Sequence, residues 1–461
     1  SAQYGSDAIA GVINLRLKEA REGGGASVTY GQYFTNVETA RGKRDEEDGR
    51  AVTVSAWQGF GLGPDGFLTL SAEYLNREPT NRSDYDPRVT PTAITARAGD
   101  PKVEQWTVFA NAGKPLNADW EAYGWAGYQD RDSESAAFPR LADNANNVPA
   151  IYPDGFLPKI AINSQDLSAA GGVRGTVAGW DADFSLVYGR NALDFRTEDS
   201  LNATYGADSP TSFDSGGLTY DQLVFGADFT RQFEVGLDGG PLNFAWGLEA
   251  RKETYKIDAG QPESWNRGPL GTNTALAGGA QGFPGFQPSN EVDEDRDAVA
   301  LYADIEIPLT EKLTVEGALR VEDYSDFGDA QTGKFAARYD FSPNFALRGS
   351  VSTGFRAPSL QQSFFTSTSS VVETGPFPAT SEVASVLGAR PLKAETSTNY
   401  TLGAVVRLGN FDLTIDAYRI EIENQIVLSE LINRSFSPQV AGLLDPLGVQ
   451  AARFFLNGVT T

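Results

Sequence analysis

The chain has 461 residues, with 37 lysines and arginines against 61 aspartates and glutamates, and it contains no cysteine, histidine or methionine. The acidic excess excludes a nucleic-acid partner, because a phosphate-binding face needs clustered positive charge. Without cysteine and histidine there is no disulfide framework, no thiolate chemistry and no Cys- or His-ligated metal, so we expect neither a metal site nor a cofactor.

No apolar run approaches the roughly 18 residues that a membrane helix needs, which excludes a helical membrane protein. A membrane β-barrel stays possible, because only alternate residues of each strand must face lipid.

The first eighteen residues, SAQYGSDAIAGVINLRLK, lack the long alternation of the rest of the chain. The charged and then glycine-rich stretch Glu19 to Gly25 reads as a connector. We therefore place a boundary there, with residues 1–22 before it and residues 23–461 forming one large β domain.

About sixteen strands follow, many of them ten residues or longer. They are predicted at 26–34, 51–60, 67–77, 104–113, 120–129, 171–178, 181–195, 220–233 and 242–255, as four runs between 296 and 353, at 395–407 and 411–422, and with a last start at Ala452.

The stretch Arg296 to Thr353 shows the pattern most clearly. Apolar residues recur at every second position, as in Leu313, Val315, Gly317, Leu319 and Val321, with polar residues between them. Each strand is therefore apolar on one face and polar on the other.

The connections fall into two populations. Tight ones are predicted at 61–66, 114–119, 178–180, 238–241, 308–312, 342–344 and 408–410; loose ones at 78–103, 131–170, 256–295, 325–332 and 354–394. Because tight and loose connections alternate, adjacent strands are antiparallel and the tight turns share one end of the sheet. Long strands with loops grown on one side are typical of a transmembrane antiparallel β-barrel.

Aromatic residues beside the tight turns, namely Trp120, Trp180, Phe341, Phe345 and Phe411, suit an interfacial girdle. A soluble sandwich or propeller also alternates, and aromatic residues close sandwich edges too.

Two later segments carry a family resemblance. SVSTGFRAPSLQQSFF from Ser350 and PLKAETSTNYTLGAVV from Pro391 resemble barrel elements of TonB-dependent outer-membrane receptors, although Ala394 stands where proline is common. YGSDAIAGVINLRLK resembles the last stretch of that family's plug domain. Runs beginning at Tyr152, Leu201 and Gly279 are similar to loops of its iron-complex branch.

The resemblance implies a 22-stranded barrel in the complete protein, of which residues 23–461 supply about sixteen strands, incomplete at the C-terminus, and residues 1–22 the end of the plug. It implies a receptor in the outer membrane of a Gram-negative bacterium, in contact with lipid and lipopolysaccharide. The ligand that the resemblance implies in the first place is a ferric siderophore or other iron complex. Cobalamin is the second alternative and an oligosaccharide the third. Energy would come from a TonB-type inner-membrane transducer through a missing N-terminal part. The rival hypothesis is a secreted all-β carbohydrate-active enzyme or adhesin.

Three motifs invite functional interpretations. Gly61 to Gly66 satisfies GxGxxG, but no helix follows, so we interpret it as a hairpin turn. Asp293, Asp295 and Asp297 begin like a calcium loop, yet the sixth position is Ala298, which favours a solvated acidic loop. Asp45 to Asp48 is interpreted as a charged outer loop, with a weak cation site shared with lipopolysaccharide as the alternative.

Nothing in the sequence indicates catalysis, so we predict that the protein is not an enzyme. Ligand binding is predicted at the long loop that carries Trp265, Phe283 and Phe286, although these aromatics could instead pack the loop on itself. Arg356, in GFRAPSL, is predicted to pair with an inner-wall carboxylate or a plug group; contact with ligand is the alternative.

Overall fold

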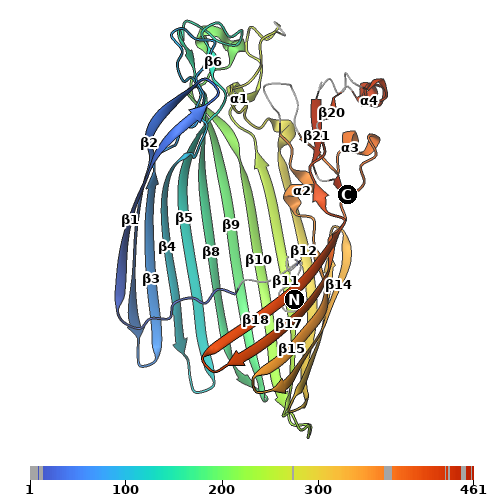
Figure 1. Cartoon of the computed structure of the whole chain (residues 1–461). Coiled ribbons are helices and arrows are strands. Elements are labelled where there is room, and N and C mark those ends of the chain that lie inside the picture. The colour runs from blue at the N-terminus through green and yellow to red at the C-terminus, as the bar shows by residue number, and fades with distance from the viewer. Residues whose placement is uncertain are drawn as a thin grey trace.

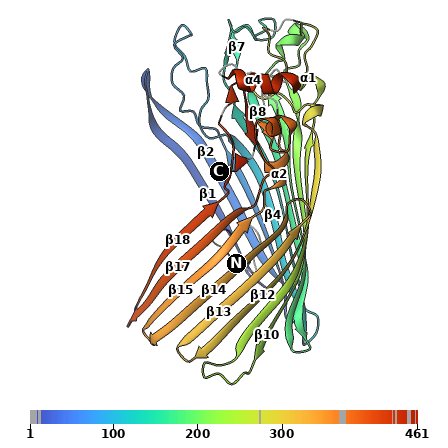
Figure 2. The ribbon, with the colours of Figure 1, turned by 90° about the vertical axis from the view of Figure 1, so that its right-hand side faces the viewer.

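The fold is a single large sheet of fifteen antiparallel strands that curls into an open trough (Figure 1). The computed structural model describes residues 9, 14–272, 275–367, 376–430, 432–433, 437–447, 453–457 and 459–460. Strands that follow one another in the chain are neighbours in the sheet, and β1 and β18 form its two edges (Figure 2). This order confirms the antiparallel arrangement predicted from the alternating connections.

The strands of the large sheet are β1 (Gly24–Thr39), β2 (Gly42–Leu62), β3 (Gly66–Arg77), β4 (Lys102–Pro115), β5 (Trp120–Ala136), β8 (Lys159–Val177), β9 (Trp180–Glu198), β10 (Phe213–Phe233), β11 (Leu242–Asp258), β12 (Val292–Thr310), β13 (Leu313–Tyr324), β14 (Gly328–Ser342), β15 (Phe345–Arg356), β17 (Glu395–Leu408) and β18 (Phe411–Glu423).

The remaining elements are short and lie in the loops. The strands are β6 (Arg140–Leu141), β7 (Gly155–Phe156), β16 (Pro376–Pro378), β19 (Ile426–Val427), β20 (Ile432–Asn433), β21 (Arg453–Asn457) and β22 (Val459–Thr460). The helices are α1 (Pro262–Trp265), α2 (Leu360–Phe364), α3 (Glu382–Val386) and α4 (Pro438–Leu444), with 3₁₀ turns at Ala203–Asp208, Pro288–Asn290 and Asp445–Leu447. None of the described helices has the length and apolar character to cross a membrane.

Alternation gives the sheet two different faces. On β12, Val299 and Leu301 are about half exposed on the convex face, whereas Ala298, Ala300 and Tyr302 are buried on the concave face. Residues directly opposite each other on neighbouring strands point to the same side, so this division continues across the sheet. Along the middle of the strands the convex face is therefore apolar, whereas small and polar side chains lie on the concave face.

Aromatic side chains gather on the convex face beside the tight turns. Trp180 packs edge-on against Phe233, Phe244 and Trp246, with ring centroids 5.8 to 6.4 Å apart. The predicted aromatics lie in the same zone: Trp120 stacks on Phe184, Phe341 stacks on Phe345, and Phe411 is 57% exposed. The predicted girdle of aromatics therefore forms at this end.

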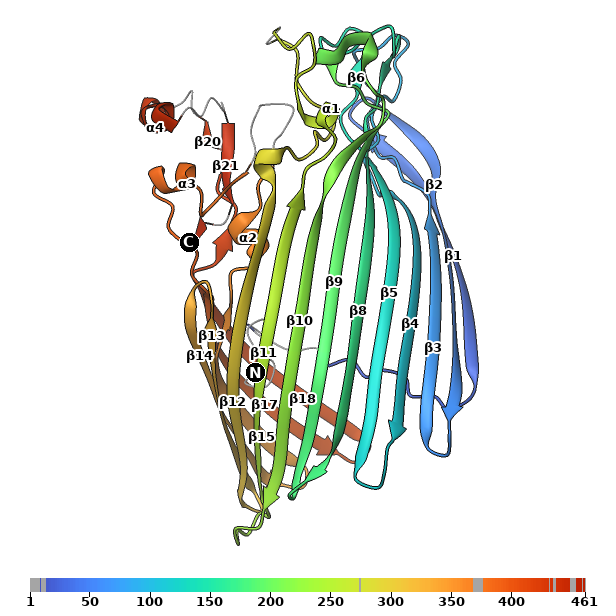
Figure 3. The same ribbon diagram turned by 180° about the vertical axis from the view of Figure 1, so that it is seen from behind.

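The tight turns share one end of the sheet, which we call the turn end, and most long connections lie at the opposite, loop end (Figure 3). One predicted loose connection is wrong. The stretch predicted as the loop 325–332 is a turn of only 325–327, because β13 and β14 continue up to it.

Several strands also run further toward the loop end than predicted. Asp45 to Asp48 lies within β2, paired with Phe34 and its neighbours on β1, and is not a loop. Likewise, Asp293, Asp295 and Asp297 lie in β12 opposite β11. Backbone pairing continues where the convex face has become polar, so alternation of apolar residues detects only part of each strand.

The last predicted strand has a different outcome from the others. Its start, Ala452, lies outside the described residues. β21, which follows, pairs with β16 and β20 in a separate three-stranded sheet. The large sheet thus contains the other fifteen predicted strands.

The N-terminal segment crosses the concave side of the trough. Near β1, the Thr69 hydroxyl accepts a hydrogen bond from the Ala20 amide (2.9 Å), and the Asn111 side chain donates one to the Lys18 carbonyl (3.1 Å). At the far side, Ser397 and Asn399 of β17 donate to the Ile9 carbonyl at 2.7 and 3.0 Å. The segment therefore spans the trough from β3 and β4 to β17; most of residues 1–13, part of the region predicted to be the plug's end, lies outside the described residues.

Candidate ligand-binding site at the loop end

A buried ion pair lies on the concave face near the loop end. Arg296 of β12 holds Glu253 of β11 through Nη2 (2.5 Å) and Nε (2.8 Å), and both side chains are at most 6% exposed. The third nitrogen of Arg296, Nη1, donates to the Pro358 carbonyl at 2.6 Å, and the Tyr220 hydroxyl donates to Glu253. The pair thus joins β10, β11 and β12 to the connection that follows β15.

A second buried guanidinium lies two strands away from Glu253. Arg320 of β13 is 1% exposed and donates to Glu322 at 2.5 Å and to Glu249 at 3.2 Å. Glu322 also accepts a hydrogen bond from Tyr324 at 2.8 Å. Such buried charges are tolerated only when paired, so this part of the wall is held in one arrangement.

Three connections at the loop end are hydrogen-bonded into one unit, which we call the three-loop cap: residues 137–158, 199–212 and 259–291. Its centre is Gln281, which is 1% exposed. Gln281 accepts a hydrogen bond from Arg140 (2.7 Å), donates to the Asn146 carbonyl (2.6 Å), and its own carbonyl accepts from Ser200 (2.6 Å). Gln281 therefore ties all three loops together, with its side chain bonded to residues 137–158 and its backbone carbonyl bonded to residues 199–212.

A second joint of the cap forms at Asn202, which is fully buried. Its side-chain amide donates to the carbonyls of Glu263 and Asn266, both at 2.9 Å, and its oxygen accepts from the Thr204 hydroxyl at 2.6 Å. Tyr205 donates to the Asn266 side chain at 2.7 Å. The cap is thus a preformed, internally bonded structure.

The predicted ligand-binding aromatics are all in this cap. Phe286 is 2% exposed and packs against Phe195 of β9 and Phe365, while Phe283 lies 5.3 Å from Phe195. Trp265 is half-buried and donates its indole N–H to the Gly260 carbonyl at 3.0 Å. Phe283 and Phe286 thus fasten the loop to the sheet and to the segment after α2, and a ligand-binding role for the three stays a prediction.

Arg356, at the end of β15, lies beside a carboxylate on the neighbouring strand. Its Nη1 is 3.6 Å from Glu395, whose side chain is 6% exposed and also accepts the Ile426 amide at 2.7 Å. The guanidinium itself is 45% exposed. The geometry offers the structural partner that we predicted, and the role of Arg356 stays a prediction.

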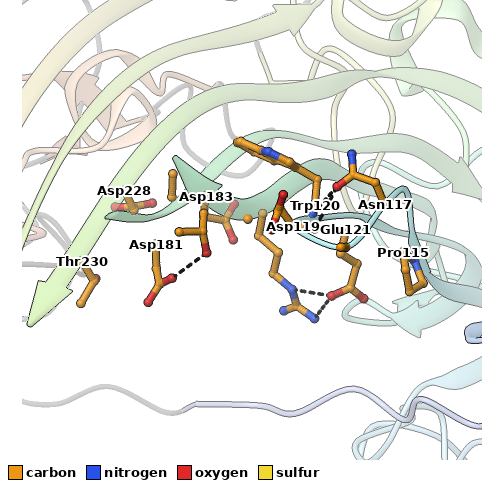
Figure 4. A pocket seen from close by; sticks show the side chains of 14 residues that line it. Pro115, Asn117, Asp119, Trp120, Glu121, Asp181, Asp183, Asp228 and Thr230 are labelled. Carbon is orange, nitrogen blue, oxygen red and sulfur yellow. Dashed lines mark hydrogen bonds and ion pairs between the residues drawn. The ribbon is translucent and has the colours of Figure 1, made fainter. Parts of the chain in front are cut away.

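The concave face also holds a cavity of about 650 Å³ at the turn end (Figure 4). Asp181, Asp183, Asp228 and Glu121 line it, and Glu121 accepts two bonds from Arg174 at 2.9 and 3.0 Å. Carboxylates outnumber basic side chains in its lining, so it favours positively charged or hydrogen-bond-donating groups.

Two charged groups in the connections at the loop end have displaced pKa values. The pKa of Asp86, in the β3–β4 connection, is lowered by hydrogen bonds from Arg88 and Thr95. Burial in the three-loop cap lowers the pKa of Arg140. The Asp86 carboxylate is therefore held ionised, and Arg140 depends on the neutral acceptor Gln281.

The sequence motifs resolve into structural features. Gly61 to Gly66 closes the β2–β3 hairpin, as predicted. Asp293 and Asp295 pair with Lys256 (2.9 Å) and Lys252 (3.3 Å) across the convex face. Within the ranges given above, no group of three or more acidic side chains is placed to hold a metal ion.

Sequence reasoning missed the buried charges Glu253, Arg296 and Arg320. The sequence did contain a signal for them. All three occupy strand positions that alternate with the apolar ones, so they lie on the same face of the sheet as Ala298, Ala300 and Tyr302. The loop-to-loop bonds of the cap had no such signal, since they join residues more than 60 positions apart.

Residues 121–443 match the family model described as TonB-dependent receptor-like β-barrel. In sequence, the chain is 27% identical over 182 residues to the ferric enterobactin receptor PirA of Pseudomonas aeruginosa. The aligned residues make up 39% of this chain and 23% of PirA. The solved structure of the siderophore receptor PirA from P. aeruginosa superimposes with a TM-score of 0.61 at 15% identity, covering 100% of this chain and 64% of PirA.

The alcaligin outer-membrane receptor FauA of Bordetella pertussis has the same fold, with a TM-score of 0.51 at 13% identity over 96% of this chain and 57% of FauA. The chain thus spans less than two thirds of the solved receptors that it matches. The family model covers well over half of the chain, and these relatives are Gram-negative outer-membrane proteins. The chain therefore belongs to the TonB-dependent receptor β-barrel family of the outer membrane.

Proposed function

We propose that the complete protein is an outer-membrane receptor for TonB-dependent uptake of a scarce, bulky nutrient, with a ferric siderophore or another iron chelate as that nutrient. The observation that carries this proposal is the trough itself: its concave wall is polar, a cap of bonded loops lies over one end, and the N-terminal segment runs inside it. This arrangement suits a binding site above a gated passage. The convex face, apolar with an aromatic girdle, would contact lipid and lipopolysaccharide.

The relatives support the choice of ligand. Their names describe receptors for ferric enterobactin and for alcaligin. We infer that this protein likewise binds and admits its ligand without chemical change, driven by a TonB-type inner-membrane energy transducer. Trp265 and Phe283 are half-buried, whereas Phe286 is buried. Because Phe283 and Phe286 already pack against Phe195 of the sheet, Trp265 is the first candidate for contact with the ligand.

The test is uptake of radioactive iron by cells that carry or lack the full-length gene, each supplied with a panel of ferric chelates. We expect uptake of at least one chelate to require both the gene and an intact TonB system. Uptake that is equal with and without the gene for every chelate would overturn the proposal. Recovery of the full-length protein in the soluble fraction would favour the rival hypothesis of a secreted enzyme or adhesin.

A further inference from the structure

A second folded unit lies at the loop end (Figure 1). It combines the connection that follows β15 with the one that follows β18, because β16 pairs with β21 and β21 pairs with β20. We call the described residues between 376 and 394 and between 426 and 457 the second loop unit. Its core is apolar and includes four buried side chains, those of Val383, Ala384, Leu444 and Leu456. Two segments that lie far apart in the chain therefore share one small core outside the large sheet.

The start of α2 is fastened to the inner wall of the sheet. The Pro358 carbonyl, just before α2, accepts the hydrogen bond from the buried Arg296 at 2.6 Å. Leu360, the first residue of α2, is 1% exposed and packs in one cluster with Tyr255 of β11 and Phe286 of the cap. The sheet and the three-loop cap therefore hold the start of α2 together.

The residues just after α2 make two more contacts with the cap. The rings of Phe365 and Phe286 lie edge-on, with centroids 6.3 Å apart. The Asn290 side chain donates a hydrogen bond to the Thr366 hydroxyl at 3.3 Å. Phe286, which is 2% exposed, therefore takes part in the contacts at both ends of α2.

α2 also contacts the second loop unit. The Thr380 hydroxyl of that unit donates to the Ser363 carbonyl of α2 at 3.3 Å, and α2 packs against β16 and β21. The unit has a separate attachment at its base, where the Ile426 amide donates to Glu395 of β17 at 2.7 Å. α2 thus joins the second loop unit to the cap, while β17 joins it to the sheet.

We propose that residues 358–366, which we call the α2 joint, couple the three-loop cap to the second loop unit, so that a displacement of either one moves the other. Protein interiors are close-packed, so Leu360 and Phe365 cannot keep their places when Phe286 moves. Arg296 holds Pro358 to the wall, and the joint therefore shifts without leaving the sheet. Thermodynamic linkage requires such a coupling to act equally in both directions. The inference goes beyond the proposed function and does not depend on the identity of the ligand.

The test measures distances between pairs of spin labels on the full-length receptor in detergent. The labels are attached through Asp154→Cys in the cap, Gln439→Cys in the second loop unit, and Asp297→Cys on β12 as the reference on the sheet; all three positions are exposed. The 461 residues contain no native cysteine, and any that the full-length protein has elsewhere is first replaced by serine. Migration before and after boiling shows that each variant is folded.

Gln281→Ala, which loosens the cap, should broaden the distance distribution between the labels at 439 and 297 at least about twofold, although Gln281 lies outside the second loop unit. In the reverse direction, Leu444→Ala, which leaves a cavity in the core of that unit, should broaden the distribution between 154 and 297. Leu428→Ala is the matched control, because it truncates a leucine at an exposed position of the same unit. With Leu360→Ala already in place, Gln281→Ala should add nothing at position 439.

Two results would overturn the coupling. If Gln281→Ala broadens only the distribution between 154 and 297, the two units move independently. If the effects of Gln281→Ala and Leu360→Ala at position 439 simply add, the coupling does not run through the joint. Phe365→Ala takes the place of Leu360→Ala in the same comparison if the latter does not fold. None of these measurements involves uptake of an iron chelate, so the proposed function is judged separately.

Discussion

The ion pair between Arg296 and Glu253 is buried, whereas the charged pairs on the convex face of the sheet are exposed to water. Its side chains are 4% and 6% exposed, whereas Lys252 and Asp295, one strand position away on the convex face, are 56% and 57% exposed. Exposed pairs contribute little because water screens them, while removing one member of a buried pair leaves an uncompensated charge. The two pairs therefore offer an internal comparison.

We predict that Glu253→Gln destabilises the folded receptor by about 3 kcal/mol, because the buried Arg296 guanidinium then loses its buried counter-charge and keeps only the more exposed Asp326 carboxylate, 3.5 Å from its Nη1. Lys252→Gln should change stability by less than about 1 kcal/mol. The measurement is the urea concentration at which each purified receptor loses its folded gel band. Equal midpoints for the two variants would contradict the buried role of Glu253.

At the scale of elements, the three-loop cap changes how the loop 259–291 should be tested. The sequence predicts only that this loop binds ligand, and on that basis alone a deletion within it would test binding without affecting the fold. In the structure this stretch contains Gln281, Phe283 and Phe286, which hold the other two loops and the sheet. A deletion would therefore dismantle the cap, and a single substitution is the sharper experiment.

We predict that Gln281→Ala loosens the cap while the sheet stays folded. The substitution removes the acceptor of Nε in the half-buried Arg140 guanidinium, which keeps only its bond to the Phe138 carbonyl, a local loss of about 1–3 kcal/mol. Limited proteolysis should then cut residues 137–158 and 259–291 faster than in the native protein. Ser289→Ala, at an exposed position of the same loop, is the control. An unchanged cleavage pattern in Gln281→Ala would show that the cap does not depend on this joint.

At the scale of the whole molecule, the family assignment leads to a physical expectation for the complete receptor. A closed barrel has no free strand edge from which to unzip, and its backbone groups are all paired within the membrane. The full-length protein should therefore fractionate with outer membranes and migrate differently on a denaturing gel before and after boiling. Identical migration in both conditions would argue against a closed barrel.

The sequence predicts this fold well where one face of a strand must be apolar. Leu313 to Val321 and Val299 to Ile307 alternate because lipid would touch every second residue, and the structure confirms those strands. The prediction fails where both faces are polar, as in Asp45 to Asp48, since backbone pairing then leaves no mark on composition. The cap could not be foreseen, because Arg140 meets Gln281 only after the sheet has brought distant loops together.

The path of the N-terminal segment has a mechanical consequence. The segment is attached to the sheet at separate points: its Ile9 carbonyl to β17, and its Lys18 and Ala20 backbone to β4 and β3. A pulling force that entered at Ile9 would load the bonds from Ser397 and Asn399 first and reach Asn111 and Thr69 only after those had parted. Bonds that break in succession resist only as strongly as the firmest one among them. The segment could therefore be drawn out of the trough by a modest force applied over a long distance, while the sheet, whose neighbouring strands share many bonds at once, would keep its shape.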